Sequence, residues 1–233
     1  LVKNYDDNFN AATENNAEQV FQIQFSVNDG SNGGNENIGE SANTPSFYPL
    51  SSFYTTWKQP SFNLVNAFKT DANGLPMLDT FNVTNMKNDE LVSGDDYSYN
   101  TYQGTVDPRL DWTVGRRGVP YLDWADPEFS TQYTYYSSNP GSDPITGWIN
   151  DRSFGGPYNP VKNNYRASQF GIYGDYYAQG YLMGSGVNYS IIRFADVLLW
   201  AAECEVEVGD LNRARQLVNY VRARARDGQY VEV

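Results

Sequence analysis

The chain has 233 residues, no histidine, one cysteine and a formal net charge of −12. The lack of histidine excludes Ser-His-Asp and Cys-His catalysis and imidazole metal ligands, and a single cysteine excludes an intrachain disulfide and a multi-thiolate metal site. The acidic balance, 28 Asp+Glu against 16 Lys+Arg, argues against nucleic acid and against an anionic membrane surface as binding partners.

The first elements predicted along the chain are short. We expect a helix over Asn10–Gln19, followed by a half-buried strand over Val20–Val27, where apolar and polar residues alternate. A loop rich in glycine and asparagine follows from Asn28 to Glu40. Pro60 then introduces a helix that runs to about Lys69 and carries apolar residues at helical spacing: Phe62, Leu64, Val65 and Phe68.

Few regular elements are expected in the middle of the chain. Asn73-Gly74 is a turn signal, and from there to Gly186 proline and glycine repeatedly interrupt the pattern. Loops this long are uncommon in compact domains and are usually functional or disordered. Because the segment is rich in aromatic residues, its composition argues against disorder.

The C-terminal part of the chain is predicted to form two antiparallel helices. The first runs from Ser190 to Val208, Gly209 ends it, and Asp210 caps the second. We expect Cys204, on the first helix, to be a small core residue. The second helix has apolar residues at helical spacing: Leu211, Ala214, Leu217, Val218, Val221 and Ala225. Two helices cannot bury both faces alone, so the pair is expected to be one unit of a helical-repeat array.

Charge and aromatic content divide the chain at Gly186. Residues 1–185 carry a net charge of −11 and 31 of the 36 aromatic residues, whereas residues 186–233 carry a net charge of −1. We therefore expect a loop-rich, aromatic-rich region over 1–185 that supplies the ligand surface. Residues 186–233 are expected to form a helix hairpin of the scaffold, and both regions to belong to one longer domain.

Flat aromatic rings suit the stacking of ligands such as sugars, although core packing is the commoner role of such rings. One aromatic cluster runs from Phe47 to Trp57, a second from Trp112 to Trp124, and a third from Tyr133 to Trp148. From the first two clusters we predict five ligand-binding residues: Tyr48, Tyr54, Trp57, Tyr121 and Trp124.

Enzymatic and metal sites are weaker alternatives. Glycoside hydrolysis needs two carboxyl groups about 5–10 Å apart, and Asp123, Asp126 and Glu128 lie close together in sequence. With 28 acidic residues such neighbours arise by chance, so no catalytic residue is predicted. The oxygen-bearing residues of the glycine-rich loop lack EF-hand spacing, and we expect no metal and no cofactor. Arg116 is expected to form a salt bridge.

Five segments in this order resemble signatures of the SusD/RagB family. They are Asn15–Ile23, Trp57–Phe68 with its Asn63-Leu64-Val65-Asn66-Ala67-Phe68 run, Asp107–Gly115 with Asp107-Pro108-Arg109-Leu110, Arg193–Glu203, and Gly209–Ala225. The resemblance covers nearly the whole chain, but family members are longer. It implies that a lipoprotein signal and most of the tetratricopeptide-like helices lie upstream, and that a closing segment lies downstream.

The resemblance also implies a fold and a function. The fold is mainly α, with tetratricopeptide-like helix hairpins, a large irregular loop-rich region and a few short strands. Members are non-catalytic, lipid-anchored proteins on the outer-membrane surface of Bacteroidota. They deliver glycans, or peptides in the RagB branch, to a SusC-like TonB-dependent transporter. Glycan capture is therefore expected, with peptide capture and a carboxylate-dependent glycoside hydrolase as alternatives.

Overall fold

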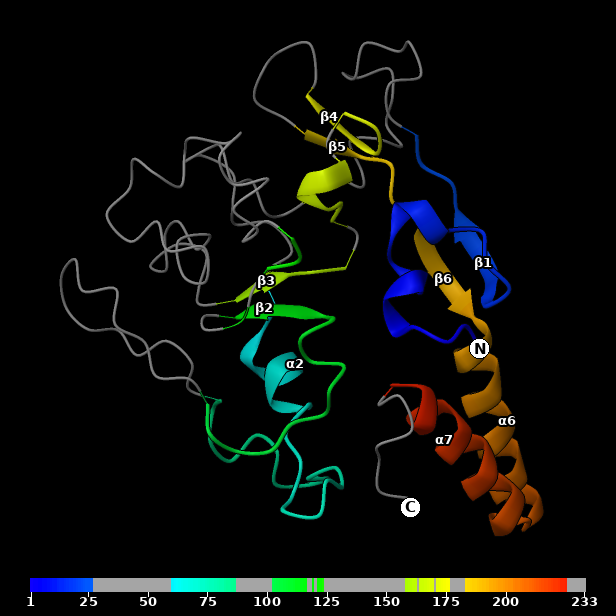
Figure 1. Ribbon diagram of the computed structural model, residues 1–233. Coiled ribbons are helices and arrows are strands. Elements are labelled where there is room, and N and C mark those ends of the chain that lie inside the picture. The colour runs from blue at the N-terminus through cyan, green and yellow to red at the C-terminus, as the bar shows by residue number, and fades with distance from the viewer. Residues whose placement is uncertain are drawn as a thin grey trace, which may run out of the picture.

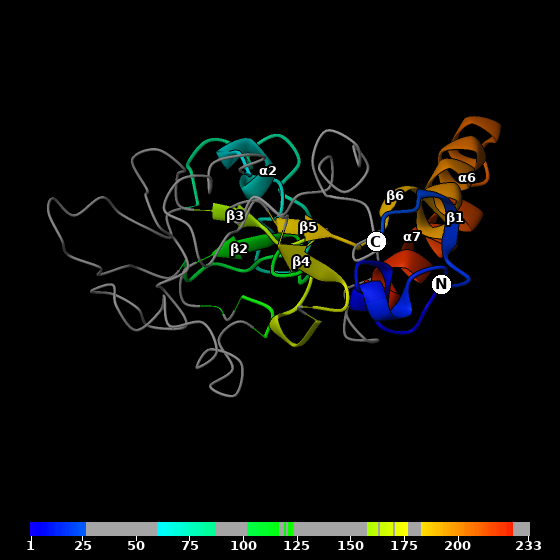
Figure 2. The same ribbon diagram turned by 90° about the horizontal axis from the view of Figure 1, so that it is seen from above.

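The computed structural model describes residues 1–26, 60–86, 102–116, 119, 121–123, 158–162, 164–169, 171–176 and 183–225. Figure 1 shows a long helix pair on one side of the molecule and short strands and loops on the other. The N-terminal segment lies between these two parts, against the strand that leads into the helix pair (Figure 2). Segments from both ends of the chain therefore meet at the middle of the molecule.

The helix pair consists of α6 (Phe194–Val208) and α7 (Leu211–Ala225), which pack through Ala202, Ala214 and Leu217. Small residues at this contact let the two helices approach closely. Gly209 ends α6 with a φ of 90°, and the Asp210 side chain accepts a hydrogen bond from the backbone N–H of Arg213 at 2.9 Å. The predicted helix pair, its glycine stop and its aspartate cap are confirmed.

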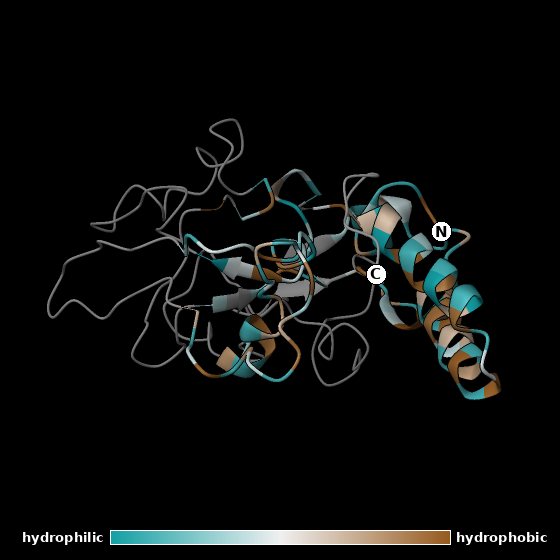
Figure 3. Cartoon of the chain, turned by 90° about the horizontal axis from the view of Figure 1, so that it is seen from below, coloured by the Kyte–Doolittle hydropathy of each residue, from teal (hydrophilic) through white to brown (hydrophobic). Residues whose placement is uncertain are grey.

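Two details of the predicted helix pair are wrong. Helix α6 begins at Phe194 rather than Ser190, because Tyr189–Arg193 forms strand β6. Cys204 is exposed rather than buried. It lies two residues beyond the buried Ala202, which is roughly 200° around the helix and therefore away from α7. Figure 3 shows hydrophobic residues along the pair and at its tip, where the side chain of Val208 is 78% exposed.

Strand β1 (Gln19–Ile23) pairs antiparallel with β6. The strand predicted over Val20–Val27 exists, but it is shorter, and Val27 lies outside the described residues. The predicted half-buried face is wrong, because Phe21 is 55% and Ile23 46% exposed. The sheet has only two strands, and register shifts on both sides of Phe21 disturb the alternation of side chains.

The helix predicted over Asn10–Gln19 is wrong. This part of the chain forms two 3-10 turns, η1 (Tyr5–Asn8) and η2 (Ala11–Thr13). Asn15 has a φ of 60°, and the Asn16 amide donates to the backbone carbonyls of Asp7 and Thr13 at 2.9 and 3.0 Å. Side-chain hydrogen bonds of this kind compete with a helix for the same backbone groups.

The irregular part is organised around α2 (Phe62–Asn66), β2 (Val114–Arg116) and β3 (Tyr158–Pro160). Its core consists of buried residues from distant segments: Val65, Met86, Leu110, Val114 and Tyr158. The Tyr158 hydroxyl donates to the backbone carbonyl of Met86 at 2.7 Å. The helix predicted from Pro60 is confirmed but ends at Asn66, and the turn at Asn73-Gly74 is confirmed by a φ of 80° at Gly74.

The remaining elements are η3 (Ala167–Gln169) and the antiparallel pair β4 (Gly174–Tyr176) and β5 (Met183–Ser185). All three sheets among the described residues have two strands. The longest regular elements there are the 15-residue helices α6 and α7. No helix in the described part of the chain is both long and apolar enough to cross a membrane.

Candidate functional site

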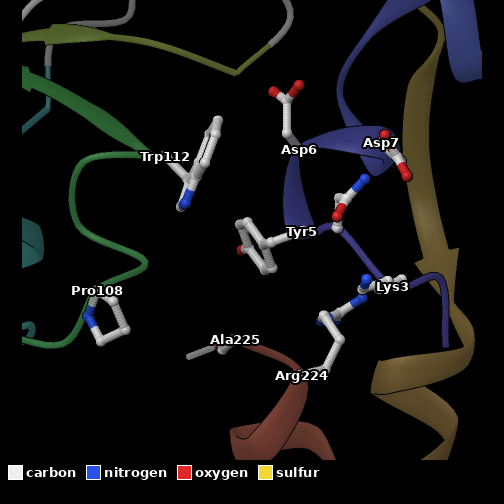
Figure 4. Close-up of a pocket in the computed structure, with 9 residues that line it drawn as sticks. Lys3, Tyr5, Asp6, Asp7, Pro108, Trp112, Arg224 and Ala225 are labelled. Atoms are coloured by element: carbon white, nitrogen blue, oxygen red, sulfur yellow. The ribbon is translucent and has the colours of Figure 1, made fainter. Parts of the chain in front are cut away.

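A pocket of about 510 Å³ opens where the N-terminal segment, the loop before β2 and the end of α7 meet. Figure 4 shows Trp112 and Pro108 on one side, Tyr5 reaching toward them from the other, and Arg224 below. The walls are formed by residues from these three segments: Lys3, Asn4, Tyr5, Asp6, Asp7, Pro108, Trp112, Arg224 and Ala225.

Tyr5 is held in place by a cluster of rings and cations. Its ring centroid lies 5.4 Å from that of Phe9. The Arg224 guanidinium lies 5.1 Å from the Tyr5 ring, and the Lys162 ammonium lies 4.6 Å from the Phe9 ring. Arg193 completes the cluster at 5.3 Å from Phe9. Cation–π contacts of this kind stabilise the rings and fix their orientation.

The position of Arg224 depends on Glu18, whose side chain is fully buried. A carboxylate oxygen of Glu18 accepts hydrogen bonds from Arg224 and from the backbone N–H of Val2, the latter at 2.9 Å. The other carboxylate oxygen lies 3.8 Å from the Arg193 guanidinium. One carboxylate therefore joins the N-terminal segment, the start of α6 and the end of α7 behind the pocket wall.

The opposite rim is stabilised by a second ion pair. Arg109 donates from Nε and Nη2 to the Asp107 carboxylate at 2.8 and 2.7 Å. This pairing raises the pKa of the Arg109 guanidinium above its usual value. The backbone N–H of Leu110 donates to the Asp107 carbonyl at 3.0 Å, which closes the turn between Pro108 and Trp112. Trp112 is 37% exposed and presents its indole to the pocket (Figure 4).

Some charged side chains of the pocket are held in ion pairs and others are not. Asp6 forms an ion pair with Arg166, and Arg224 with Glu18. Among the described residues, the side chains of Lys3 and Asp7 have no such partner, so both are free to meet a ligand. An indole face beside charged and amide groups can stack on a sugar ring and hydrogen-bond its hydroxyls. The described residues contain no group of three or more His, Cys, Asp or Glu that could hold a metal ion.

Of the five predicted ligand-binding residues, the structure describes Tyr121 alone. Tyr48, Tyr54, Trp57 and Trp124 lie outside the described residues. Tyr121 is 1% exposed; its hydroxyl donates to the Pro160 carbonyl at 2.5 Å and accepts from the Asn164 amide at 2.7 Å. The structure therefore places Tyr121 in the core, where its hydroxyl is engaged by protein groups.

Two other residues singled out in the sequence, Asp123 and Arg116, have structural roles. Of the three acids considered for hydrolysis, Asp123 accepts hydrogen bonds from the backbone N–H groups of Ala167 and Ser168, at 2.6 and 3.0 Å. Asp126 and Glu128 lie outside the described residues. The predicted salt bridge of Arg116 is confirmed by its contact with Asp111 at 2.6 Å.

Sequence reasoning missed most of the pocket. Trp112 belongs to the second aromatic cluster, but it was not among the five predicted ligand-binding residues. Tyr5 and Arg224 had no recognisable signal, because each is brought to the pocket by contacts between segments far apart in the chain. The Glu18–Arg224 pair, for example, spans 206 positions.

Comparisons with known proteins agree on one family. The family model described as the SusD family matches residues 17–233. A crystal structure of a SusD-like protein from Bacteroides fragilis NCTC 9343 aligns with a TM-score of 0.56 at 21% identity, over 100% of this chain and 41% of that one. A SusD superfamily protein from Bacteroides vulgatus ATCC 8482 aligns with a TM-score of 0.42 at 17% identity, over 100% of this chain and 36% of that one. No curated protein matches the sequence. The first structure supports a SusD-like fold, of which this chain spans less than half.

Proposed function

Because this chain belongs to the SusD family, whose members are generally non-catalytic nutrient-binding components of the outer membrane, we propose that it binds glycans at the cell surface. The bound glycan is passed to a SusC-like TonB-dependent transporter. A lipid anchor elsewhere in the full-length protein holds it to the membrane. The function is binding without bond cleavage.

The observation that carries the proposal is the pocket at Trp112. A partly exposed indole stands opposite Tyr5 in a space of about 510 Å³, and the free side chains of Lys3 and Asp7 line the same space. A pocket of this size accepts one or two sugar rings, since small-molecule sites span roughly 300–1,000 Å³. Stacking on the indole with hydrogen bonds at the walls is the arrangement that glycan recognition needs.

Aromatic residues predicted from the sequence would bind further sugar units beyond the pocket. Tyr48, Tyr54, Trp57 and Trp124 remain proposed ligand contacts for further sugar units. Tyr121 is withdrawn because of its buried position. The helix pair α6–α7 belongs to the scaffold, and the transporter mostly contacts that scaffold. The ligand pocket reaches this scaffold at the end of α7, through Arg224 and Ala225.

Binding assays on the full-length protein test the proposal. Affinity electrophoresis and calorimetry against a panel of polysaccharides should show binding to at least one, with no release of reducing ends over extended incubation. Retention of peptides with no glycan bound would favour the peptide-capture alternative. Reducing ends that disappear when a single Asp or Glu is replaced would overturn the non-catalytic assignment and indicate a glycosidase.

A further inference from the structure

The charge around the pocket differs from that of the protein as a whole. The chain carries a net charge of −12, and residues 1–185 alone carry −11. An acidic protein repels an anionic ligand at long range. At physiological ionic strength this repulsion is screened beyond about 8 Å, so the charges beside the pocket decide what the pocket accepts.

Cations gather at the pocket. Lys3 and Arg224 line it, and Arg166 pairs with the lining residue Asp6. Lys162 and Arg193 lie behind the wall, 5.7 and 6.0 Å from the centroid of the Tyr5 ring. With Arg109 on the opposite rim, the described residues of the pocket and its immediate contacts include six cationic side chains.

Fewer acidic side chains lie at the pocket and its immediate contacts, and most of them form ion pairs. Glu18 is fully buried between Arg224 and Arg193, and Asp196 lies 3.7 Å from Arg193. Asp6 is paired with Arg166. Asp107 is paired with Arg109. Among the described residues Asp7 is the remaining acid, which leaves six cations against five acids, a net charge of +1. The surroundings of the pocket are thus positive in a protein that is otherwise strongly negative.

Lys3 is the cation best placed to meet a ligand. It is exposed, it lines the pocket, and among the described residues no carboxylate pairs with it. Lys162 likewise lacks an acidic partner in the described part of the chain, but it contacts the Tyr5 and Phe9 rings. An ammonium group that lines a pocket with an indole wall suits a sugar that carries a carboxylate.

We propose that this pocket binds an acidic sugar, a uronic acid unit attached to an otherwise neutral glycan, with Trp112 against the sugar ring and Lys3 at the carboxylate. The inference rests on the proposed glycan-binding function and names its ligand class. A single acidic unit fits the local charge of the pocket. A glycan that is anionic along its whole length does not fit, because Lys3 can pair with only one of its carboxylates and the unpaired Asp7 in the same wall repels the next.

Matched ligands test the proposal on the full-length protein. Calorimetry compares glucuronoxylan and a glucuronic acid-bearing arabinogalactan with the same polysaccharides after carboxyl reduction, which removes the charge and keeps the sugar ring. Polygalacturonate serves as the uniformly anionic probe. We expect at least one native polysaccharide to bind roughly three- to tenfold more tightly than its reduced form, and polygalacturonate to bind more weakly than that native polysaccharide.

Variants identify the group responsible. Lys3→Gln should abolish the preference for the native over the reduced polysaccharide, because it removes the ammonium group and keeps a polar side chain of similar length. Arg215→Gln removes one exposed charge roughly 14 Å along α7 from Arg224, beyond a Debye length, and should leave the preference intact.

The outcomes separate this inference from the proposed function. Equal binding of native and reduced polysaccharides, or a preference that survives Lys3→Gln, overturns the acidic-sugar assignment while glycan binding stands. Failure of every polysaccharide to bind overturns both.

Discussion

Glu18 and Arg224 form an ion pair whose side chains are 0% and 6% exposed, although 206 positions separate them in the chain. The pair fastens the end of α7 to the N-terminal segment and so sets one wall of the pocket. A buried ion pair of this kind contributes modestly to the free energy of unfolding. The loss of one partner costs much more, because the other charge is left buried without a counter-charge.

Glu18→Gln should therefore destabilise the protein strongly. Arg224 would remain buried without its counter-charge, and Arg193 would keep Asp196 but lose the Glu18 carboxylate. We expect the free energy of unfolding to fall by about 3–5 kcal/mol, measured by denaturant titration. Glu203→Gln, the same exchange at an exposed position of α6, should change it by less than about 0.5 kcal/mol. Similar effects of the two variants would contradict the role assigned to the buried pair.

Trp112→Ala should weaken glycan binding without unfolding the protein. Stacking on an aromatic ring contributes about 1–2 kcal/mol, so affinity should fall roughly five- to thirtyfold. Trp200→Ala is the matched control, because Trp200 is 51% exposed on α6 and does not line the pocket. Calorimetry with the best-binding polysaccharide measures both variants. An unchanged affinity for Trp112→Ala would remove this pocket from the ligand surface.

Glu14 should make stability depend on pH. Burial raises the pKa of Glu14 above its usual value of 4.5, and the hydrogen bond from the backbone N–H of Asn188 opposes the shift. A raised folded-state pKa means that the contribution of Glu14 is fully present below pH 4.5 and is lost as pH rises through the folded-state pKa. Glu14→Gln should therefore gain stability relative to the wild type as pH rises from 4 to 7.

Asp71 should show the opposite dependence. Its carboxylate accepts hydrogen bonds from the backbone N–H groups of Leu75 and Asn73, both at 2.8 Å, which lower its pKa below the usual value of 3.8. Its contribution is present above pH 3.8 and is lost as pH falls through the lowered pKa. Asp71→Ala should therefore be less stable than the wild type at neutral pH, and the two stabilities should converge in acid. Unfolding curves recorded at several pH values distinguish the two signs.

Gly209→Ala should destabilise the helix pair through the backbone alone. Gly209 has a φ of 90°, and an added Cβ would meet no atom within 4 Å, so no collision contributes. The left-handed conformation costs an alanine about 1–2 kcal/mol. Gly209→Asn should lose less stability than Gly209→Ala, since asparagine adopts the left-handed conformation more readily. Equal losses for both variants in thermal unfolding would contradict this explanation.

Local patterns predicted the parts of the fold that depend on neighbours in sequence. The α6–α7 pair, its stop at Gly209 and its cap at Asp210 follow from helical spacing and end signals, and the structure confirms them. The family and its SusD-like fold were also recognisable, because five local motifs occur in order.

Patterns failed where particular side-chain contacts decide the outcome. The run Asn10–Gln19 has the residues of a short helix, yet the Asn16 amide binds the Thr13 carbonyl, which a helix would need, and the Asp7 carbonyl before it. Tyr121 belongs to the same aromatic cluster as the partly exposed Trp112, yet it is buried, and its hydroxyl is bound to Asn164 and Pro160, about 40 positions along the chain. The pocket could not be predicted for the same reason, since Tyr5, Trp112 and Arg224 have no common local pattern.

The distance in sequence between the two sides of the pocket also governs when it can form. A ribosome adds about 5–20 residues per second, so roughly 10–40 s pass between the synthesis of Glu18 and that of Arg224. Throughout this interval the Glu18 carboxylate has no α7 to bind, and the N-terminal segment lacks its final anchor. The pocket can therefore form only after α7 has been synthesised. A chain that ends before α7 should be unable to retain ligand there.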